Sequence, residues 1–268
     1  MGGFDLGLVR AGMEIVFQVE IDEFCRKVLA KHAPEYWPNA ERFNDVKEVG
    51  KHNLKPVDLL CGGFPCQPFS DIGKRQGEAD ERALWKEYAR IIGELKPKWV
   101  LGENVSGLLT IDNGGYFRGI LRDLSELGYN AEWGIIPASY LGASHRRERV
   151  YIVAYSHSLE RKRRGTSLHI FETGAQNGGT WPNIGNSLRN GSESWGHSTF
   201  YQLQSFNSQL QRIRESSPWQ NEPGICRVVN GSSNGVDRAK RLKGIGNAVV
   251  PQIVEILGRC IMEIENDT

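Results

Sequence analysis

Short β-branched runs alternate with helical stretches from the start of the chain to about residue 155. This alternation is typical of a mostly parallel sheet covered by helices, because two parallel strands need a crossover segment between them. Strands are predicted at residues 15–19, 57–61, 99–101, 131–136 and 150–154, and helices near residues 22–32, 81–95 and 115–127. The first part of the chain is therefore predicted to be an α/β domain.

The character of the sequence changes between residues 156 and 240, where Ser, Asn, Gly and Gln are frequent and regular periodicity fades. This segment predicts a small, irregular, loop-rich lobe. Apolar residues then recur at helical spacing over residues 253–264, which predicts an amphipathic helix that packs back on the first domain. We therefore assign residues 1–155 plus 241–268 to a core domain and residues 156–240 to a variable lobe.

The bulk composition is that of an ordinary globular protein. Hydrophobic residues make up 39% of the 268-residue chain and charged residues 24%, values that indicate neither a disordered nor a fibrous protein. No run reaches the roughly 18 consecutive apolar residues of a membrane span, and the first residues lack the pattern of a signal peptide. We expect a cytoplasmic protein without membrane association.

Cysteine and charge patterns narrow the classes of partner. The five cysteines are scattered and contain no Cys-x-x-Cys pair, so neither a disulfide framework nor a zinc site is expected. Residues 156–242 carry 11 Lys/Arg against 6 Asp/Glu, including the basic run at residues 161–164. Arg161 and Arg163 in this run suit contact with the phosphates of a polyanion, and a solvated surface with a local charge imbalance fits the same pattern.

Cys66 is a candidate nucleophile at the end of a predicted strand. Two glycines at residues 62–63 and Pro65 fix a tight loop that can hold the thiol within reach of a substrate. A lone cysteine is usually a small buried hydrophobe, and reactivity needs a lowered pKa or a nearby base. Arg147 and Arg149 precede another predicted strand and can bring positive charge to the same side of the sheet.

Further polar residues follow other predicted strands, where open α/β sheets bind ligands. Glu103 either caps a helix or serves a site, and Asn104 either holds the polar edge of a substrate or fixes a turn. Glu20 lies about seventeen residues after Gly3, an arrangement like that of nucleotide sites in which an acid binds ribose hydroxyls. Asp45 suits an adenine amino group or a plain turn.

The content and order of these runs resemble those of the cytosine-C5 DNA methyltransferases. The clearest matches are Phe-Pro-Cys-Gln at residues 64–67 and Glu-Asn-Val at residues 103–105. The other matching runs are residues 2–8 with 11–12, 19–22, 82–85, 145–150 and 246–252. The resemblance covers residues 1–155 and 241–262, and it implies a doubly wound, Rossmann-like sheet of the S-adenosylmethionine-dependent methyltransferase type with a small target-recognition lobe.

The resemblance also implies a DNA (cytosine-5-)-methyltransferase mechanism. In that mechanism the Cys66 thiolate attacks C6 of a cytosine, and Glu103 hydrogen-bonds or protonates N3 so that C5 becomes nucleophilic and takes the methyl group. The target base is flipped out of the duplex, since neither thiol nor cofactor reaches C5 within the stack. Arg147 and Arg149 match arginines that lie near the flipped cytosine.

By the same resemblance the methyl donor is S-adenosylmethionine, and no metal is expected. The implied cofactor-binding residues are Gly2, Gly3, Phe4, Glu20, Ile21, Asp45, Val46, Leu84 and Asn247. The candidate DNA-binding residues are Ser70, Asn104, Arg161 and Arg163. Expected partners are double-stranded DNA and a restriction endonuclease of the same system, and we expect a monomer.

The chain departs from the family pattern in three ways. The first motif starts at its glycine pair, so one central strand is missing and its neighbours are expected to be unpaired in mid-sheet. We therefore expect either a true start further upstream or a decayed gene, and tighter S-adenosylmethionine binding by a chain extended upstream. His145 stands where the family commonly has Gln. No run matches the usual ninth motif before Lys243.

Two other readings stay open at the level of sequence. A thymidylate-synthase-like enzyme also uses a Pro-Cys nucleophile on a pyrimidine, although the glycine pair and Glu20 speak against it. A catalytically impaired remnant of the methyltransferase family that still binds DNA is the alternative from another functional class.

Overall fold

A computed structural model describes residues 1–65, 78–143, 145–162, 211–213 and 248–266, with only the backbone course for residues 78–83 and 160–162. The described strands form two sheets. One has the order β3-β4-β6-β5, and the other is the pair β1-β2. The strands are β1 (Phe17–Val19), β2 (Glu41–Phe43), β3 (Leu59–Gly63), β4 (Trp99–Val105), β5 (Tyr129–Pro137) and β6 (Glu148–Ser156).

The strands pair in both parallel and antiparallel directions. β1 pairs with β2 and β3 with β4 in parallel, while β6 is antiparallel to both β4 and β5. β4 is paired on both sides and every residue from Trp99 to Asn104 is buried. Six of the nine β6 residues, Val150 to Tyr155, are also buried, so these two strands form the centre of the fold.

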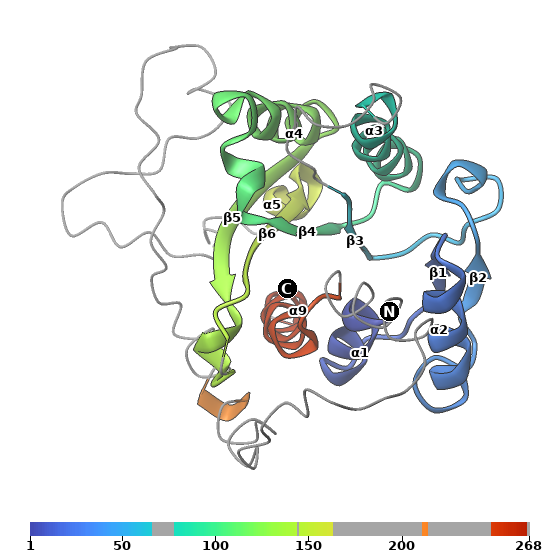
Figure 1. Cartoon of the computed structure of the whole chain (residues 1–268). Coiled ribbons are helices and arrows are strands. Elements are labelled where there is room, and N and C mark those ends of the chain that lie inside the picture. The colour runs from blue at the N-terminus through green and yellow to red at the C-terminus, as the bar shows by residue number, and fades with distance from the viewer. Residues whose placement is uncertain (66–77, 144, 163–210, 214–247, 267–268) are drawn as a thin grey trace.

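Helices cover both faces of the four-stranded sheet, which gives the three layers visible in Figure 1. α3 (Glu78–Leu95) and α4 (Gly115–Glu126) lie on one face, and α1 (Gly3–Arg10) and α9 (Pro251–Asn266) on the other. The remaining elements are α2 (Glu23–Tyr36), α5 (His157–Lys162) and the 3-10 turns η1 (Val46–Glu48), η2 (Ser106–Leu109), η3 (Ile111–Gly114) and η4 (Ala138–Leu141). Among the described residues, no helix is long and apolar enough to cross a membrane.

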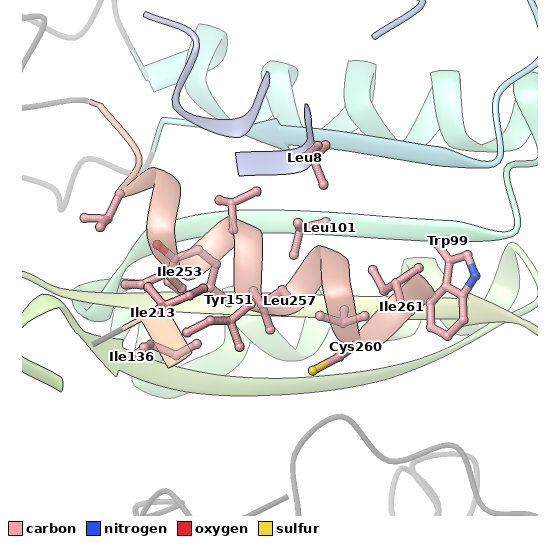
Figure 2. Close-up of a cluster of buried hydrophobic side chains, with 14 of the residues drawn as sticks. Leu8, Trp99, Leu101, Ile136, Tyr151, Ile213, Ile253, Leu257, Cys260 and Ile261 are labelled. Atoms are coloured by element: carbon pink, nitrogen blue, oxygen red, sulfur yellow. The ribbon is translucent and has the colours of Figure 1, made fainter. Parts of the chain in front are cut away.

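α9 supplies much of one hydrophobic core although it lies about 100 residues beyond the sheet in sequence. Ile253, Leu257 and Ile261 pack against Leu101 and Tyr151 of the central strands (Figure 2). The far end of the helix is fastened by the Trp99 indole, whose Nε1 donates to Glu265 Oε1 at 2.7 Å. The closing amphipathic helix predicted at residues 253–264 is therefore confirmed, with slightly wider bounds.

Glycines allow α1 to approach α9 closely. A Cβ at Gly7 would lie 2.5 Å from the Pro251 carbonyl oxygen, and a Cβ at Gly3 would overlap the Val249 carbonyl oxygen. No helix was predicted from the sequence at the position of α1. Local helix propensity is lowered by glycine, but burial of the Leu8 side chain against α9 favours the helix.

The α/β fold predicted from the sequence is confirmed, with corrections at particular elements. Each of the five predicted strands is present, and the third extends four residues further, to Val105. The short strand β2 and the helix α5 were not predicted. Among the described residues, the β1-β2 pair is hydrogen-bonded separately from the four-stranded sheet. Most of the predicted variable lobe at residues 156–240 lies outside the described residues, and its boundaries stay predictions.

Candidate active site

Glu103 lies within β4 rather than after it, opposite Gly63 on one side and Tyr151 on the other. Its neighbour Gly63 matters because a Cβ there would lie 3.3 Å from Glu103 Oε2. Only 7% of Glu103 is exposed, and burial raises the pKa of its carboxyl from 4.5 to about 7, while Arg149 and Arg147 act in the opposite direction. This acid is therefore able to hold and to release a proton near neutral pH.

Two arginines of the β6 start flank this carboxylate. Arg149 Nε lies 3.1 Å from Glu103 Oε1, with the side chains 18% and 10% exposed. Arg147 precedes β6 in a left-handed backbone conformation, with φ of 35°. Its pKa is lowered by burial and by the charge of Arg149. The cations limit the pKa rise of Glu103, and they suit hydrogen-bond acceptors of a flat polar ligand.

Asn104 connects the strand that carries Glu103 to the loop that leads to Cys66. Its Nδ2 donates to the Phe64 carbonyl oxygen at 2.8 Å, and its Oδ1 accepts from the Val105 amide at 2.8 Å. Asn104 is only 3% exposed. A buried amide whose two ends bond within the protein fixes the loop, and the predicted contact of Asn104 with DNA stays a prediction.

Several sequence-predicted site residues fall outside this description. Cys66, Ser70, Arg163 and Asn247 lie outside the described residues, and the side chain of Arg161 does as well. The structure describes the nucleophile loop as far as Pro65, directly after Phe64, whose ring packs on Trp85 at a centroid distance of 5.1 Å. The roles of the five residues whose side chains lie outside the described part of the chain therefore stay predictions.

The segment at residues 248–250 links the Glu103 region to the glycine pair at the start of α1. Arg147 Nη2 donates to the Ala248 carbonyl oxygen. The adjacent Val249 carbonyl oxygen is the atom that approaches Gly3 so closely that no side chain fits there. Gly2 also has a left-handed backbone, with φ of 79°, directly before α1. Residues 248–250 therefore contact both Arg147 and the first residues of α1.

Of the other predicted cofactor residues, some follow β1 or β2 and two lie on helices. Glu20 follows β1, and Ile21 beside it is 72% exposed, which is unusual for a large apolar side chain. Asp45 follows β2, and its Oδ1 accepts from the Lys47 amide to cap η1, which begins at Val46. Leu84 on α3 is half-buried, and Phe4 packs at the margin of the α1–α9 core.

These residues fit the chemistry of a nucleoside ligand. Two carboxylates suit ribose hydroxyls and an exocyclic amino group, and an exposed isoleucine suits the face of a flat ring. No group of three His, Cys, Asp or Glu side chains able to hold a metal ion occurs among residues whose side chains the structure describes.

Sequence reasoning missed Gly63 and Tyr151 as neighbours of Glu103. The two glycines before Pro65 were interpreted as a loop, whereas both lie in β3, where the absence of a side chain leaves room for the Glu103 carboxylate. The available signal was the position of a glycine at the end of a predicted strand, which indicates close approach of another group. Nothing in the sequence pairs Tyr151 with Glu103, because their register depends on the antiparallel ladder.

Comparisons with known proteins identify relatives of this chain. A sequence model of the family described as C-5 cytosine-specific DNA methylase matches residues 1–227. The Type II methyltransferase M.BsuFI of Bacillus subtilis is 38% identical over 160 residues, which are 59% of this chain and 38% of that protein. The Type II methyltransferase M.HhaI of Haemophilus parahaemolyticus is 34% identical over 160 residues, 59% of this chain and 47% of that protein.

The matched region spans less than half the length of each of these two relatives. Among solved structures, the S. pombe Dnmt2 methyltransferase superposes with a TM-score of 0.53 at 15% identity, covering 99% of this chain and 96% of the other. This likeness concerns the fold, and it agrees with the α/β architecture described above.

Proposed function

The chain belongs to the C-5 cytosine-specific DNA methylase family, and we propose that it transfers a methyl group from S-adenosylmethionine to C5 of a flipped cytosine in duplex DNA. The observation that carries this proposal is the buried Glu103, whose pKa of about 7 suits a group that gives and regains a proton at neutral pH. Asn104 fastens the strand of this acid to the loop that leads to Cys66.

Acid catalysis and covalent attack support each other in this scheme. The Cys66 thiolate bonds to C6 of the cytosine, the C5–C6 electron pair moves toward C4, and the C4–N3 pair takes the proton of Glu103 at N3. The ring now carries electron density at C5. S-adenosylmethionine, when bound, supplies the methyl group that C5 accepts. Glu103 regains the N3 proton, and loss of the C5 proton to water expels the Cys66 thiolate and restores the ring.

The arginines and the cofactor residues have supporting roles in the proposal. Arg149 orients the Glu103 carboxyl through its contact at 3.1 Å, and Arg147 provides a second cation for the polar edge of the base. Glu20 would hold ribose hydroxyls, and Asp45 the adenine amino group. Ile21 and Leu84 would contact the adenine ring, and the other proposed cofactor residues are Gly2, Gly3, Phe4, Val46 and Asn247.

Ser70, Arg161 and Arg163 are proposed to contact DNA, the two arginines through phosphates. The Type II names of the relatives support a restriction endonuclease as a further partner that shares the recognition sequence. We propose a monomer acting in the cytoplasm.

The test uses duplex DNA and two chemical readouts. Purified protein is incubated with labelled S-adenosylmethionine and either unmethylated genomic DNA or free deoxycytidine nucleotides, and the DNA is then sequenced after bisulfite treatment. We expect label in DNA alone, at cytosines in one sequence context. Label in the free nucleotide, or none in DNA, would contradict the proposal.

A second arm traps the intermediate. DNA that contains 5-fluorocytosine keeps the covalent adduct, because fluorine at C5 cannot leave as a proton does. We expect a denaturation-resistant protein–DNA complex that Cys66→Ala abolishes. The matched control is Cys25→Ala, which changes a buried cysteine on α2 and should leave the adduct intact.

A further inference from the structure

Arg90 of α3 holds the turn that carries Asp45 and Val46. Its Nη2 donates to the Val49 carbonyl oxygen at 2.8 Å and to the Val46 carbonyl oxygen at 3.1 Å. These two carbonyls lie at the start of η1 and directly after its end. One guanidinium thus binds both ends of a single turn that lies more than 40 residues earlier in the sequence.

Two carboxylates on the same helix fix the guanidinium itself. Arg90 Nε donates to Glu87 at 2.8 Å, and Nη1 donates to Glu94 at 2.7 Å. Glu94 also accepts from the Lys51 amide at 2.9 Å. The pKa of the Glu94 carboxyl is lowered, mainly by the hydrogen bond from Arg90. Gly50 leaves room for these side chains, since a Cβ there would meet the Glu94 carboxylate and lie 3.0 Å from Arg90 Nη1.

The topology explains why this turn needs a fastening to α3. β2 belongs to a two-stranded sheet that is hydrogen-bonded separately from the four-stranded sheet. Within the part of the chain that the structure describes, no strand ladder joins the two sheets, so hydrogen bonds of this kind do not set the position of the residues that follow β2 relative to α3. Burial of the Val49 side chain beneath the turn gives an apolar contact, and Arg90 adds directional hydrogen bonds to it.

α3 carries Leu84 as well as Arg90, while Asp45 caps the turn that Arg90 binds. We propose that Arg90 is a positioning residue for the adenine end of the cofactor site, because it sets the spacing between Leu84 and the Asp45–Val46 turn. This inference rests on the proposed function, and it adds a residue that touches neither cofactor nor DNA. Its effect is on recognition of the adenine amino group rather than on the chemical step.

The experiment compares two probes that differ only at the adenine amino group. S-adenosylhomocysteine carries this group, and S-inosylhomocysteine carries an oxo group in its place. The unaltered protein should bind the first about tenfold more tightly, because Asp45 accepts from the amino group. In Arg90→Gln the preference should fall to about twofold or less, with the KM for S-adenosylmethionine raised about tenfold and kcat within about threefold.

Arg259→Gln is the matched control. Arg259 also bonds a glutamate one turn earlier, Glu255, and donates to a carbonyl of another element, that of Arg10, at 2.9 Å. It fastens α9 to α1, so its loss should leave the probe preference unchanged. Arg90→Lys keeps the charge and one donor toward the turn, and should give an intermediate preference while keeping the protein folded.

Hydrogen exchange tests directly whether Arg90 holds the turn at residues 46–50, independently of its effect on cofactor binding. Amides 46–50 should exchange faster in ligand-free Arg90→Gln than in the unaltered protein, and unchanged exchange there would overturn the inference. A probe preference and KM within twofold of the unaltered protein would overturn it too. If the unaltered protein binds neither probe, the proposed function fails, whereas binding with an unchanged preference in Arg90→Gln contradicts only the role of Arg90.

Discussion

Glu103 and Arg149 form an ion pair at 3.1 Å across two neighbouring strands, yet burial keeps the pKa of the Glu103 carboxyl near 7. The two effects oppose each other, since burial disfavours the charged carboxylate and the guanidinium favours it. The result is an acid that is poised at the pH at which the proposed reaction takes place. Neither residue alone would produce this value.

The proton on Glu103 predicts how activity depends on pH. Glu103 loses its proton as pH rises through about 7, so the proton-donating form declines above that pH, while the thiolate form of Cys66 increases. We expect a bell-shaped profile of kcat/KM with an alkaline limb near pH 7. Glu103→Gln should lower kcat by roughly 100-fold to 10,000-fold and remove this limb.

The control for this profile is Glu255→Gln on α9. Glu255 is likewise buried and pairs with an arginine, Arg259, at 2.8 Å, but it lies outside the site. The bell shape should survive in this variant. An unchanged limb in Glu103→Gln would assign the ionisation to another group.

The bond from Asn104 to Phe64 predicts an effect on the nucleophile loop. Asn104→Asp keeps the shape but replaces the Nδ2 donor by an oxygen that faces the Phe64 carbonyl. We expect stability to fall by about 1–3 kcal/mol and adduct formation with 5-fluorocytosine DNA to slow about tenfold or more. Rates of adduct formation and chemical denaturation measure the two effects.

Tyr129→Phe provides the comparison. The buried Tyr129 hydroxyl donates to the Pro97 carbonyl oxygen at 2.7 Å, and Tyr129 is neither in the Cys66 loop nor among the proposed cofactor residues. A similar loss of stability without slower adduct formation is expected. Equal slowing in both variants would show that the Asn104 effect is general destabilisation.

The sequence predicted elements whose signal is local and missed those that depend on distant contacts. β-branched runs marked each of the five strands of the core domain, because the strands are buried and apolar. α1 was missed, since Gly3 and Gly7 lower local helix propensity and the helix is stabilised by α9 from the other end of the chain.

In the candidate site, too, features with a local sequence signal were predicted and features that depend on distant contacts were not. Glu103 was selected by its place near a strand end, but Glu is depleted in strands, so its position inside β4 was not expected. Its raised pKa depends on burial, which no local pattern reports. Arg90 was not selected at all, because a helical arginine gives no sign that it binds carbonyls more than 40 residues away.

The contact between Gly3 and Val249 predicts a stability effect with a clear control. In Gly3→Ala the new Cβ would overlap the Val249 carbonyl oxygen, so α1 must move away from residues 248–250. We expect a loss of about 1–3 kcal/mol and weaker S-adenosylhomocysteine binding. Gly119→Ala on α4 meets no atom within 4 Å, and better helix propensity should stabilise it by about 0.5–1 kcal/mol. Thermal denaturation and calorimetric titration distinguish the two variants.

Removal of the hydroxyl is expected to have opposite effects on stability at two tyrosines. The Tyr151 hydroxyl is buried opposite Glu103 and has no hydrogen-bond partner within the described part of the chain, whereas the Tyr129 hydroxyl donates to the Pro97 carbonyl oxygen at 2.7 Å. A buried unpaired hydroxyl costs free energy, and a paired one contributes about 1 kcal/mol. Tyr151→Phe should therefore raise the free energy of unfolding by about 1 kcal/mol, and Tyr129→Phe should lower it by a similar amount. Urea denaturation of both variants measures the difference, and equal losses in the two would mean that the Tyr151 hydroxyl bonds to a group beyond the described residues.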